Sequence, residues 1–333
     1  MGSPDESYER LAAQLRKAPQ TRDAWSEFVA AAKATGRAAE AVGLCISLYD
    51  ADPTLVHPLQ ALLDLVPDEP ESEYVVPSVP ESARPPISIV TCSNDDGRLA
   101  AMVASYANAL ADWPHEIVRI ADAVSLAEGY NRGAARAAGE ILIFTHDDVE
   151  ILPRDFGHRL AQRIAECEIL GIAGATRATG PAWPFAGWPF LHGAVIYPDG
   201  DGYRVTAYSR KVPLAHGIRV MDGVFLAMDR KIALRVGWDE AICDGFHGYD
   251  VDFTLRAAQA GMRLAVASDL GVVHRSSGSF DDQWEVTARK LVARHPELNG
   301  ECGKETGPVA RSVPTARHAL ALVDNWTRMG RGN

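Results

Sequence analysis

The residues best placed for chemistry are His146, Asp147 and Asp148, which follow the apolar run 141–144 after a single threonine. That run predicts a short buried strand over 140–145, so the histidine and both carboxylates come at the end of a strand. Mg²⁺ and Mn²⁺ bind protein carboxylates and complete their shells with diphosphate oxygens and water. The pattern favours a site for such a cation. The alternative is a turn whose aspartates cap the helix that follows.

A second polar cluster begins at Asp222, just before another apolar run, and continues over 246–256. Asp250 stands at the predicted start of a helix there, where the helix dipole favours an acid whatever its function. Asp252 and Arg256 are four residues apart on that helix, as in an intrahelical ion pair. A purely structural interpretation of this cluster therefore stays open beside a catalytic one.

A third cluster begins with His274, the last residue of a predicted strand. Arg275 and a loop rich in serine and glycine follow it. The guanidinium and the N–H groups of such a loop can cradle phosphate oxygens. A single histidine after a strand is more often a polar surface residue. Whether His274 is functional therefore depends on its position relative to the other clusters.

Alternating strands and helices must position these clusters. Apolar runs predict strands at 87–92, 116–121 and 140–145, with helices at 99–110 and 125–138. This alternation indicates a parallel sheet covered on both faces. Such sheets bind ligands at the carboxyl ends of their strands. The polar residues at two further strand ends are Ser93, Asn94, Asp95 and Asp122.

The N-terminal segment 7–66 carries apolar residues at spacings of three and four, which predict helices. A single repeat is too short for a solenoid, which needs about three. The segment is therefore either a helical cap on the next domain or a module that docks proteins or peptides. The residues that match a tetratricopeptide hairpin are Trp25, Phe28, Ala32, Ala41 and Pro53.

Prolines and acidic residues over 67–86 indicate an extended linker. The chain then divides into four expected parts. They are a helical domain (1–66), the linker (67–86), an α/β domain (87–296) and a C-terminal helical tail (297–333). We expect the tail to pack on the sheet or to form a homodimer contact.

The 333-residue chain carries a formal net charge of −11. This charge disfavours a nucleic-acid partner, whose phosphates require a basic face. No run reaches the ~18 apolar residues that span a bilayer, so we expect no membrane-spanning segment. The five cysteines are scattered, and the first residues lack the basic and apolar regions of a signal peptide. Together these features favour a cytoplasmic protein with reduced thiols.

The stretch from Ser125 to Asp148 resembles the core of family 2-type glycosyltransferases, which have the GT-A fold. In that family an Asn-x-Gly helix, an Ala-x-Gly-Glu turn and a hydrophobic strand lead to a D-x-D metal motif. Residues 131–133 and 137–140 match the first two features. His146 replaces the first Asp of the motif, as in an H-x-D subgroup, and Asp148 matches the second.

The resemblance extends over residues 87–296 and implies a mixed, mostly parallel α/β sheet. It implies a nucleoside diphosphate sugar as donor, with uridine diphosphate as the expected carrier. It also implies Mn²⁺ or Mg²⁺ held by Asp148, His274 and His146, for which a sugar or phosphate contact is the alternative. The residues implied on the donor side are Ser93, Asn94, Asp95, Asp122, Asn131, Asp147 and Arg275. For Asp122 a turn residue, and for Asn131 a polar residue of the helix face, is the alternative.

On the acceptor side, Asp250 matches the aspartate that acts as general base in inverting members of the family. Such a carboxylate takes the proton of the acceptor hydroxyl as the oxygen attacks the anomeric carbon. Tyr249 departs from the family pattern, which has a glutamate at this position. The other residues implied on this side are Asp222, Gly223 and His247.

A loop over 180–192 lies between the clusters and contains four large aromatic residues with proline and glycine. It predicts either a lid or a platform on which an acceptor ring stacks. Trp188 is the residue we assign to the acceptor. The alternative is a hydrophobic cluster under a loop.

The sequence thus predicts a metal-dependent, inverting glycosyltransferase that moves a hexose to a hydroxyl of a glycan, a peptide or a small molecule. One alternative is an inactive GT-A domain that serves as a binding scaffold, which the departures at His146 and Tyr249 favour. Another is a metal-dependent phosphohydrolase, although HD-type enzymes carry their His-Asp pair on helices. A Rossmann dehydrogenase is disfavoured because residues 92–97 lack the G-x-G-x-x-G pattern.

Overall fold

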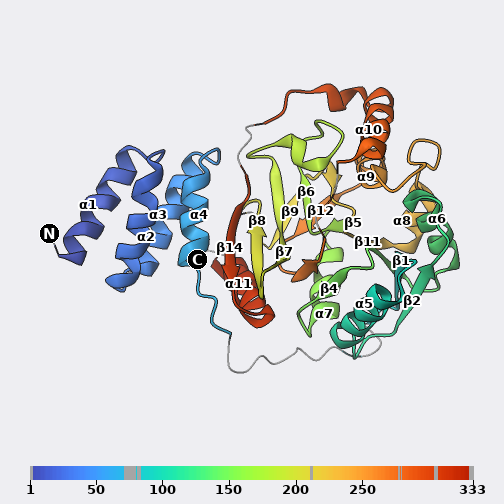
Figure 1. Cartoon of the computed structure of the whole chain (residues 1–333), viewed down its shortest axis with the longest axis horizontal. Coiled ribbons are helices and arrows are strands. Elements are labelled where there is room, and N and C mark those ends of the chain that lie inside the picture. Colours follow the sequence, from blue (N-terminus) through green and yellow to red (C-terminus); the bar gives the residue numbers. More distant parts are fainter. Residues whose placement is uncertain are drawn as a thin grey trace.

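The computed structural model describes residues 3–70, 80, 84–210, 213–276, 278, 280–303 and 307–329. A helical N-terminal region stands beside a larger α/β domain (Figure 1). This division confirms the predicted combination of a small all-α part with a mixed α/β domain.

The N-terminal region consists of α1 (Pro4–Lys17), α2 (Arg22–Ala34), α3 (Ala38–Ala51) and α4 (Val56–Leu65). Each helix buries the apolar stripe that its spacing predicted, for example Leu11 and Leu15 on α1 and Phe28 and Ala32 on α2. α1 packs on α2, and α3 packs on α4. α2 and α3, which carry the residues that match a tetratricopeptide hairpin, also contact each other, so the helices agree with that resemblance. α4 lies against the α/β domain.

The first sheet is built from β1 (Ile87–Cys92), β2 (His115–Ile120), β3 (Ile141–Thr145), β5 (Ile169–Gly171), β9 (Leu214–His216), β11 (Phe225–Asp229) and β12 (Leu264–Ala267). Its order is β2-β1-β3-β11-β5-β12-β9. β1 pairs in parallel with β2 and β3, and β12 with β5, whereas β11 and β9 run antiparallel to their neighbours. Most of these strands point the same way, which confirms the predicted mixed, mostly parallel sheet. β3 is buried at every position, as its unbroken apolar run predicted.

The second sheet is built from β4 (Val149–Ile151), β6 (Ala173–Ala175), β7 (Leu191–Asp199), β8 (Gly202–Ala207), β10 (Val220–Met221), β13 (Val272–His274) and β14 (Val309–Val313). Its order is β10-β6-β7-β13-β4, and β8 and β14 extend it from β7. β7 and β8 form a hairpin with a turn at Gly200 and Asp201. β13 pairs antiparallel with β4, and this register places His274 opposite Val149.

Helices pack on both sheets. α6 (Leu126–Arg136) packs on β1 and β2, and α5 (Asp96–Ala109) packs on β4. The hydroxyl of Ser125 accepts the N–H of Glu128 at 3.1 Å, so α6 begins at the predicted cap. The remaining helices are α7 (Phe156–Ile164), α8 (Arg230–Val236), α9 (Tyr249–Gln259), α10 (Asp282–Arg294) and α11 (Ala316–Met329), with 3-10 turns η2 (Trp183–Ala186) and η3 (Pro296–Asn299).

The C-terminal tail differs from the helical segment that we expected. Residues 309–313 form β14, which pairs with β8, and α11 follows it. Ala310, Arg311 and Ser312 separate the two valines, so the segment has no apolar run and pairing with β8 decides its conformation. α11 packs on β8 and β14, which agrees with the expectation that the tail packs on the sheet. The homodimer contact stays a prediction.

The expected linker is described in part. Residues 67–70, 80 and 84–86 have no regular secondary structure. Residues 71–79 and 81–83 of the expected linker lie outside the described residues, and the four-part division of the chain stays a prediction. Within the described part of the chain, no helix is both long and apolar enough to cross a bilayer. A cytoplasmic location stays a prediction.

Candidate active site

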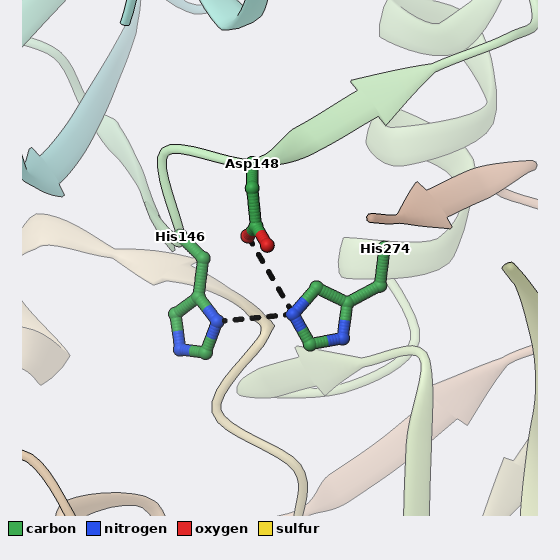
Figure 2. Close-up of side chains that lie close together, drawn as sticks. All are labelled: His146, Asp148 and His274. Atoms are coloured by element: carbon green, nitrogen blue, oxygen red, sulfur yellow. Dashed lines mark hydrogen bonds and ion pairs between the residues drawn. The ribbon is translucent and has the colours of Figure 1, made fainter. Parts of the chain in front are cut away.

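Two strand ends bring His146, Asp148 and His274 together. Residues 146–148 join β3 to β4, and the pairing of β13 with β4 places His274 opposite Val149. His146 Nδ1 is 3.3 Å from His274 Nε2, which is 3.5 Å from a carboxylate oxygen of Asp148 (Figure 2). One potential ligand atom from each residue lies within 4.8 Å of the others. We call these three residues the triad.

The protonation states of His146 and Asp148 suit a divalent cation. Burial and the neighbouring His274 lower the pKa of His146, so its imidazole is neutral and can offer a lone pair. Burial alone would raise the pKa of Asp148, but the Ser276 hydroxyl and the two histidines hold it below its usual range. Neutral imidazoles and ionised carboxylates are the forms that bind metals. Two imidazoles make the set less suited to Mg²⁺, which prefers oxygen ligands.

Tyr249 orients His146. Its hydroxyl lies 2.8 Å from His146 Nε2, while Nδ1 of the same ring faces His274. An Nε2–H that donates to the tyrosine oxygen leaves the Nδ1 lone pair free for a cation. The glycine at 223 makes room for this contact, since a Cβ there would lie 2.2 Å from the Tyr249 hydroxyl. The two departures from the family pattern therefore contact each other.

Asp250 begins α9 beside the loop that enters β11. Its carboxylate accepts the N–H of Gly223 at 3.0 Å and of Val251 at 2.9 Å. Burial and the negative charge of Asp222 raise the pKa of Asp250 to about 7. Trp183 fixes Asp222 by donating its indole N–H to the carboxylate at 2.8 Å. A carboxylate with a pKa near neutrality is suited to accept a proton at neutral pH.

One cavity of about 680 Å³ contains both the triad and Asp250. Its volume is in the usual range for a small-molecule site. Trp183, Tyr197 and Tyr208 line it as well, and we call these three residues the aromatic wall. Trp183 packs edge-on against Tyr208, with ring centroids 4.9 Å apart. The predicted residues that line this cavity are His146, Asp147, Asp148, Asp222, His247, Tyr249, Asp250 and His274.

Asp122 and Asn131, which were predicted to contact the donor, are among the residues outside the lining of this cavity. Asp122 is exposed and pairs with Arg132 at 2.9 Å, which holds the pKa of that carboxyl below its usual range. The side-chain amide of Asn131 bonds the backbone of Trp238 and the carboxylate of Glu240. These contacts match the structural alternative for each residue, and their donor roles stay predictions.

The residues after β1 mainly shape the backbone. Ser93 lies beside the cavity and donates its hydroxyl to Asp147 at 2.7 Å. Asp95 caps α5 by accepting the N–H groups of Gly97 and Arg98. Asn94 is exposed. Ser93 therefore acts on the site through Asp147, whereas the donor contacts predicted for Asn94 and Asp95 stay predictions.

Arg275 lies in a neighbouring cavity. Its guanidinium pairs with Glu150 at 2.5 Å, and its backbone N–H donates to the Asp148 carbonyl at 3.1 Å. This second cavity, of about 870 Å³, shares Arg98, Asp147, Asp148 and Ser276 with the first. The two cavities are therefore neighbours across the segment that joins β3 to β4.

The aromatic loop presents a different tryptophan from the one that we predicted. Trp188 is 1% exposed, and its indole N–H donates to the Pro53 carbonyl at 2.6 Å. Trp183 lines the cavity instead. Both tryptophans precede a proline in the sequence, so no local signal separates them. Tyr197 and Tyr208 were also missed, because a single tyrosine on or beside a strand carries no functional signal.

The family model described as Glycosyltransferase like family matches residues 88–295. No curated protein matches the sequence. Among solved structures, the chain is similar to a mutant of Drosophila beta-1,4-galactosyltransferase 7 in complex with manganese, UDP-Gal and xylobiose, with 14% identity, a TM-score of 0.37, and coverage of 61% of this chain and 79% of that one. It is also similar to the mannosyltransferase PcManGT from Pyrobaculum calidifontis in complex with GDP-Man and Mn²⁺, with 14% identity, a TM-score of 0.39 and coverage of 79% and 75%. A third structure, A197 from STIV, has 12% identity, a TM-score of 0.33 and coverage of 59% and 97%.

The family match begins within β1 and ends directly after α10. It contains all three residues of the triad and Asp250, and it coincides with the segment over which the sequence motifs suggested a glycosyltransferase. Because it spans more than half of the 333 residues, the chain belongs to the glycosyltransferase like family.

Proposed function

We propose that this protein moves a hexose from a nucleoside diphosphate to an acceptor hydroxyl with inversion, in a reaction that requires Mn²⁺. The observation that carries the proposal is the position of the triad and Asp250 in one cavity. Membership of the glycosyltransferase family supports sugar transfer as the reaction class. Uridine diphosphate remains our expectation for the carrier.

His146, Asp148 and His274 would hold the cation. A bound Mn²⁺ supplies positive charge that stabilises the diphosphate as it leaves. The two imidazoles favour Mn²⁺ over Mg²⁺ as this ion. Tyr249 keeps His146 in the required orientation, and Ser276 lies 3.2 Å from His274 Nε2.

Asp250 would be the general base. The acceptor oxygen forms a bond to the anomeric carbon while the bond from that carbon to the diphosphate breaks, and Asp250 takes the hydroxyl proton. The N–H groups of Gly223 and Val251 hold the carboxylate in place. A single displacement of this kind inverts the anomeric centre.

The aromatic wall supports an acceptor with a flat, partly apolar face. Trp183 and Tyr208 line the same cavity as Asp250. A sugar ring can lay its C–H face on such rings while its hydroxyl groups bond nearby polar groups. Among the glycan, peptide and small-molecule acceptors that we expected, this wall favours a glycan.

The decisive experiment measures release of nucleoside diphosphate by the full-length protein. UDP-glucose, UDP-galactose, UDP-N-acetylglucosamine and GDP-mannose would each be supplied together with a panel of simple glycan acceptors, and with Mn²⁺ or with a chelator. We expect release from at least one donor in Mn²⁺, and its loss in the chelator and in Asp148→Ala. Asp201→Ala, in the exposed turn between β7 and β8, is the matched control.

Each alternative function has its own outcome in this assay. A binding scaffold would bind a donor but release no diphosphate under any condition. A phosphohydrolase would release inorganic phosphate from simple phosphate esters and show no preference for sugar nucleotides. Either result would reject the proposed transfer reaction.

A further inference from the structure

The helical N-terminal region contacts the loop that carries Trp183. The turn between α3 and α4 offers the Pro53 carbonyl to the buried Trp188 indole at 2.6 Å. In the same loop, Trp183 donates to Asp222 at 2.8 Å. One short loop therefore links the helical region to a carboxylate beside Asp250.

A second contact links the helical region to the segment that carries Tyr208. Asp50 on α3 accepts from the Arg210 guanidinium at 2.5 and 2.6 Å. Arg210 follows Tyr208 closely in the chain, and the Tyr208 ring packs against Trp183. Both contacts of the helical region thus end on segments that carry the aromatic wall.

The loop between these contacts is held at several points. The Gly303 N–H donates to the Ala186 carbonyl at 3.0 Å, and the Gly180 N–H donates to the Leu298 carbonyl at 2.7 Å. A Cβ at Gly187 would lie 2.7 Å from the backbone of Gly303, so the loop passes directly over that residue. A loop fixed in this way passes a displacement at Trp188 on to Trp183 instead of absorbing it.

α4 packs on β14 at one part of this interface. At the part that faces the aromatic wall lies a cavity of about 470 Å³, lined by Tyr49, Asp50 and Pro53 on the helical side and by Pro189, Phe190 and Arg210 among others on the α/β side. The Trp188 and Arg210 contacts bridge the two sides beside this cavity, so they connect the helical region to the segments of the aromatic wall.

We infer that the helical N-terminal region is a positioning part of the acceptor side of the site. Pro53 and Asp50 hold Trp188 and Arg210, and through them the region fixes Trp183, Tyr208 and the Asp222 carboxylate. Trp188 is accordingly a positioning residue. The inference rests on the proposed function for the role of the cavity as acceptor site, but the coupling itself is a property of the chain alone.

Amide hydrogen exchange of the full-length protein, without donor or metal, tests the coupling. The amide of Val224 donates to Asp222, and that of Gly223 donates to Asp250, so both report on these carboxylates. Trp188→Phe keeps the ring and removes the indole N–H. We expect this variant to raise the amide exchange rate of residues 222–224 by about fivefold or more. Local opening of the segment costs less free energy when the Trp188 hydrogen bond is absent. Trp183→Phe is the positive reference.

Two further variants keep the test decisive if Trp188→Phe folds poorly. Asp50→Asn changes an exposed side chain and should raise exchange over 222–224 in the same direction. Gln60→Met is the matched control, because Gln60 bonds Ala310 of β14 at the same interface but away from the loop. It should raise exchange over 309–313 and leave 222–224 unchanged.

Two results would overturn the inference. One is unchanged exchange over 222–224 in both Trp188→Phe and Asp50→Asn. The other is an equal rise with Gln60→Met, which would indicate general loosening. Failure of the proposed function is seen separately, as absence of diphosphate release from every donor, and it leaves the exchange result intact. If a donor is turned over, Trp188→Phe should raise the acceptor KM more than it lowers kcat.

Discussion

Tyr249 and His146 contact each other, and this contact changes how their departures from the family pattern are interpreted. Each alone departs from the acidic residue of the family pattern and, taken alone, favours an inactive domain. Their 2.8 Å contact shows a phenol that holds an imidazole in a triad with Asp148 and His274. The departures are therefore compatible with a metal site of a different composition.

Tyr249→Phe is expected to weaken Mn²⁺ binding by about tenfold or more, because His146 loses the partner that fixes its ring. Calorimetric titration of Mn²⁺ in the presence of uridine diphosphate measures this affinity. Tyr106→Phe, a buried tyrosine outside the cavity lining, is the control. Equal affinities for the Tyr249→Phe variant and the unmodified protein would remove Tyr249 from this role.

Sugar transfer is expected to accelerate as the pH rises through about 7. Burial and Asp222 raise the pKa of Asp250 to about 7, so the carboxyl is protonated below that pH and cannot accept a proton. Asp250→Asn should lower the rate by about 10²-fold or more and remove this limb of the pH profile. Asp222→Asn should move the limb to lower pH. A rate independent of pH across this range would contradict the assignment of the base.

At the residue scale, the sequence located groups at the ends of strands and at the start of a helix. His146, Asp148 and His274 follow from motifs at strand ends, and Asp250 follows from a motif at the start of α9. Trp183 could not be separated from Trp188, because the choice depends on which indole meets Pro53 and which meets Asp222. Such pairings join distant segments and leave no local pattern.

At the scale of elements, α4 completes the outer edge of the second sheet. The Gln60 amide donates to the Ala310 carbonyl at 3.0 Å and accepts the Ala310 N–H at 3.1 Å. The side chain therefore imitates a neighbouring strand on β14, which would otherwise present unpaired backbone groups. The helical region and the sheet share this hydrogen-bonded seam.

Gln60→Ala is expected to lower the free energy of unfolding by about 1–3 kcal/mol, since it leaves two partly buried backbone groups without their partners. The melting temperature, followed by circular dichroism, should fall by a few degrees. Gln162→Ala on the exposed face of α7 provides the control. Equal melting temperatures for both variants would show that the seam adds nothing to stability.

The elements with a strong local signal were predictable and those without one were not. β1, β2, β3 and α6 carry apolar runs or caps that set their positions before any tertiary contact forms. β9 and β10 are short, and β14 has no unbroken apolar run, so their strand geometry comes from the partners with which they pair. The tail was expected to be helical for this reason.

At the scale of the whole molecule, the triad joins the two sheets. His146 follows β3 of the first sheet, whereas Asp148 and His274 flank the β4–β13 pair of the second. A cation bound to all three residues would connect strand ends from both sheets. Ligand binding is therefore expected to stabilise the α/β domain as a unit.

Mn²⁺ with uridine diphosphate is expected to raise the melting temperature of the full-length protein. Binding to the folded state alone adds about 2.7 kcal/mol when the free ligand is at 100 times its Kd. A thermal-shift assay measures the rise, and a chelator should reverse it. Asp148→Ala should melt at the same temperature with and without the ligands. A rise that persists in this variant would place the binding elsewhere.

The composition of the triad has a consequence for the order of events. Asp148 is its single acidic member, so a divalent ion held there by one carboxylate and two imidazoles retains positive charge. A diphosphate supplies the missing negative charge, and its departure removes it. The ion is therefore expected to enter together with the sugar nucleotide and to leave with the spent carrier, which would make turnover follow the free manganese concentration around the protein.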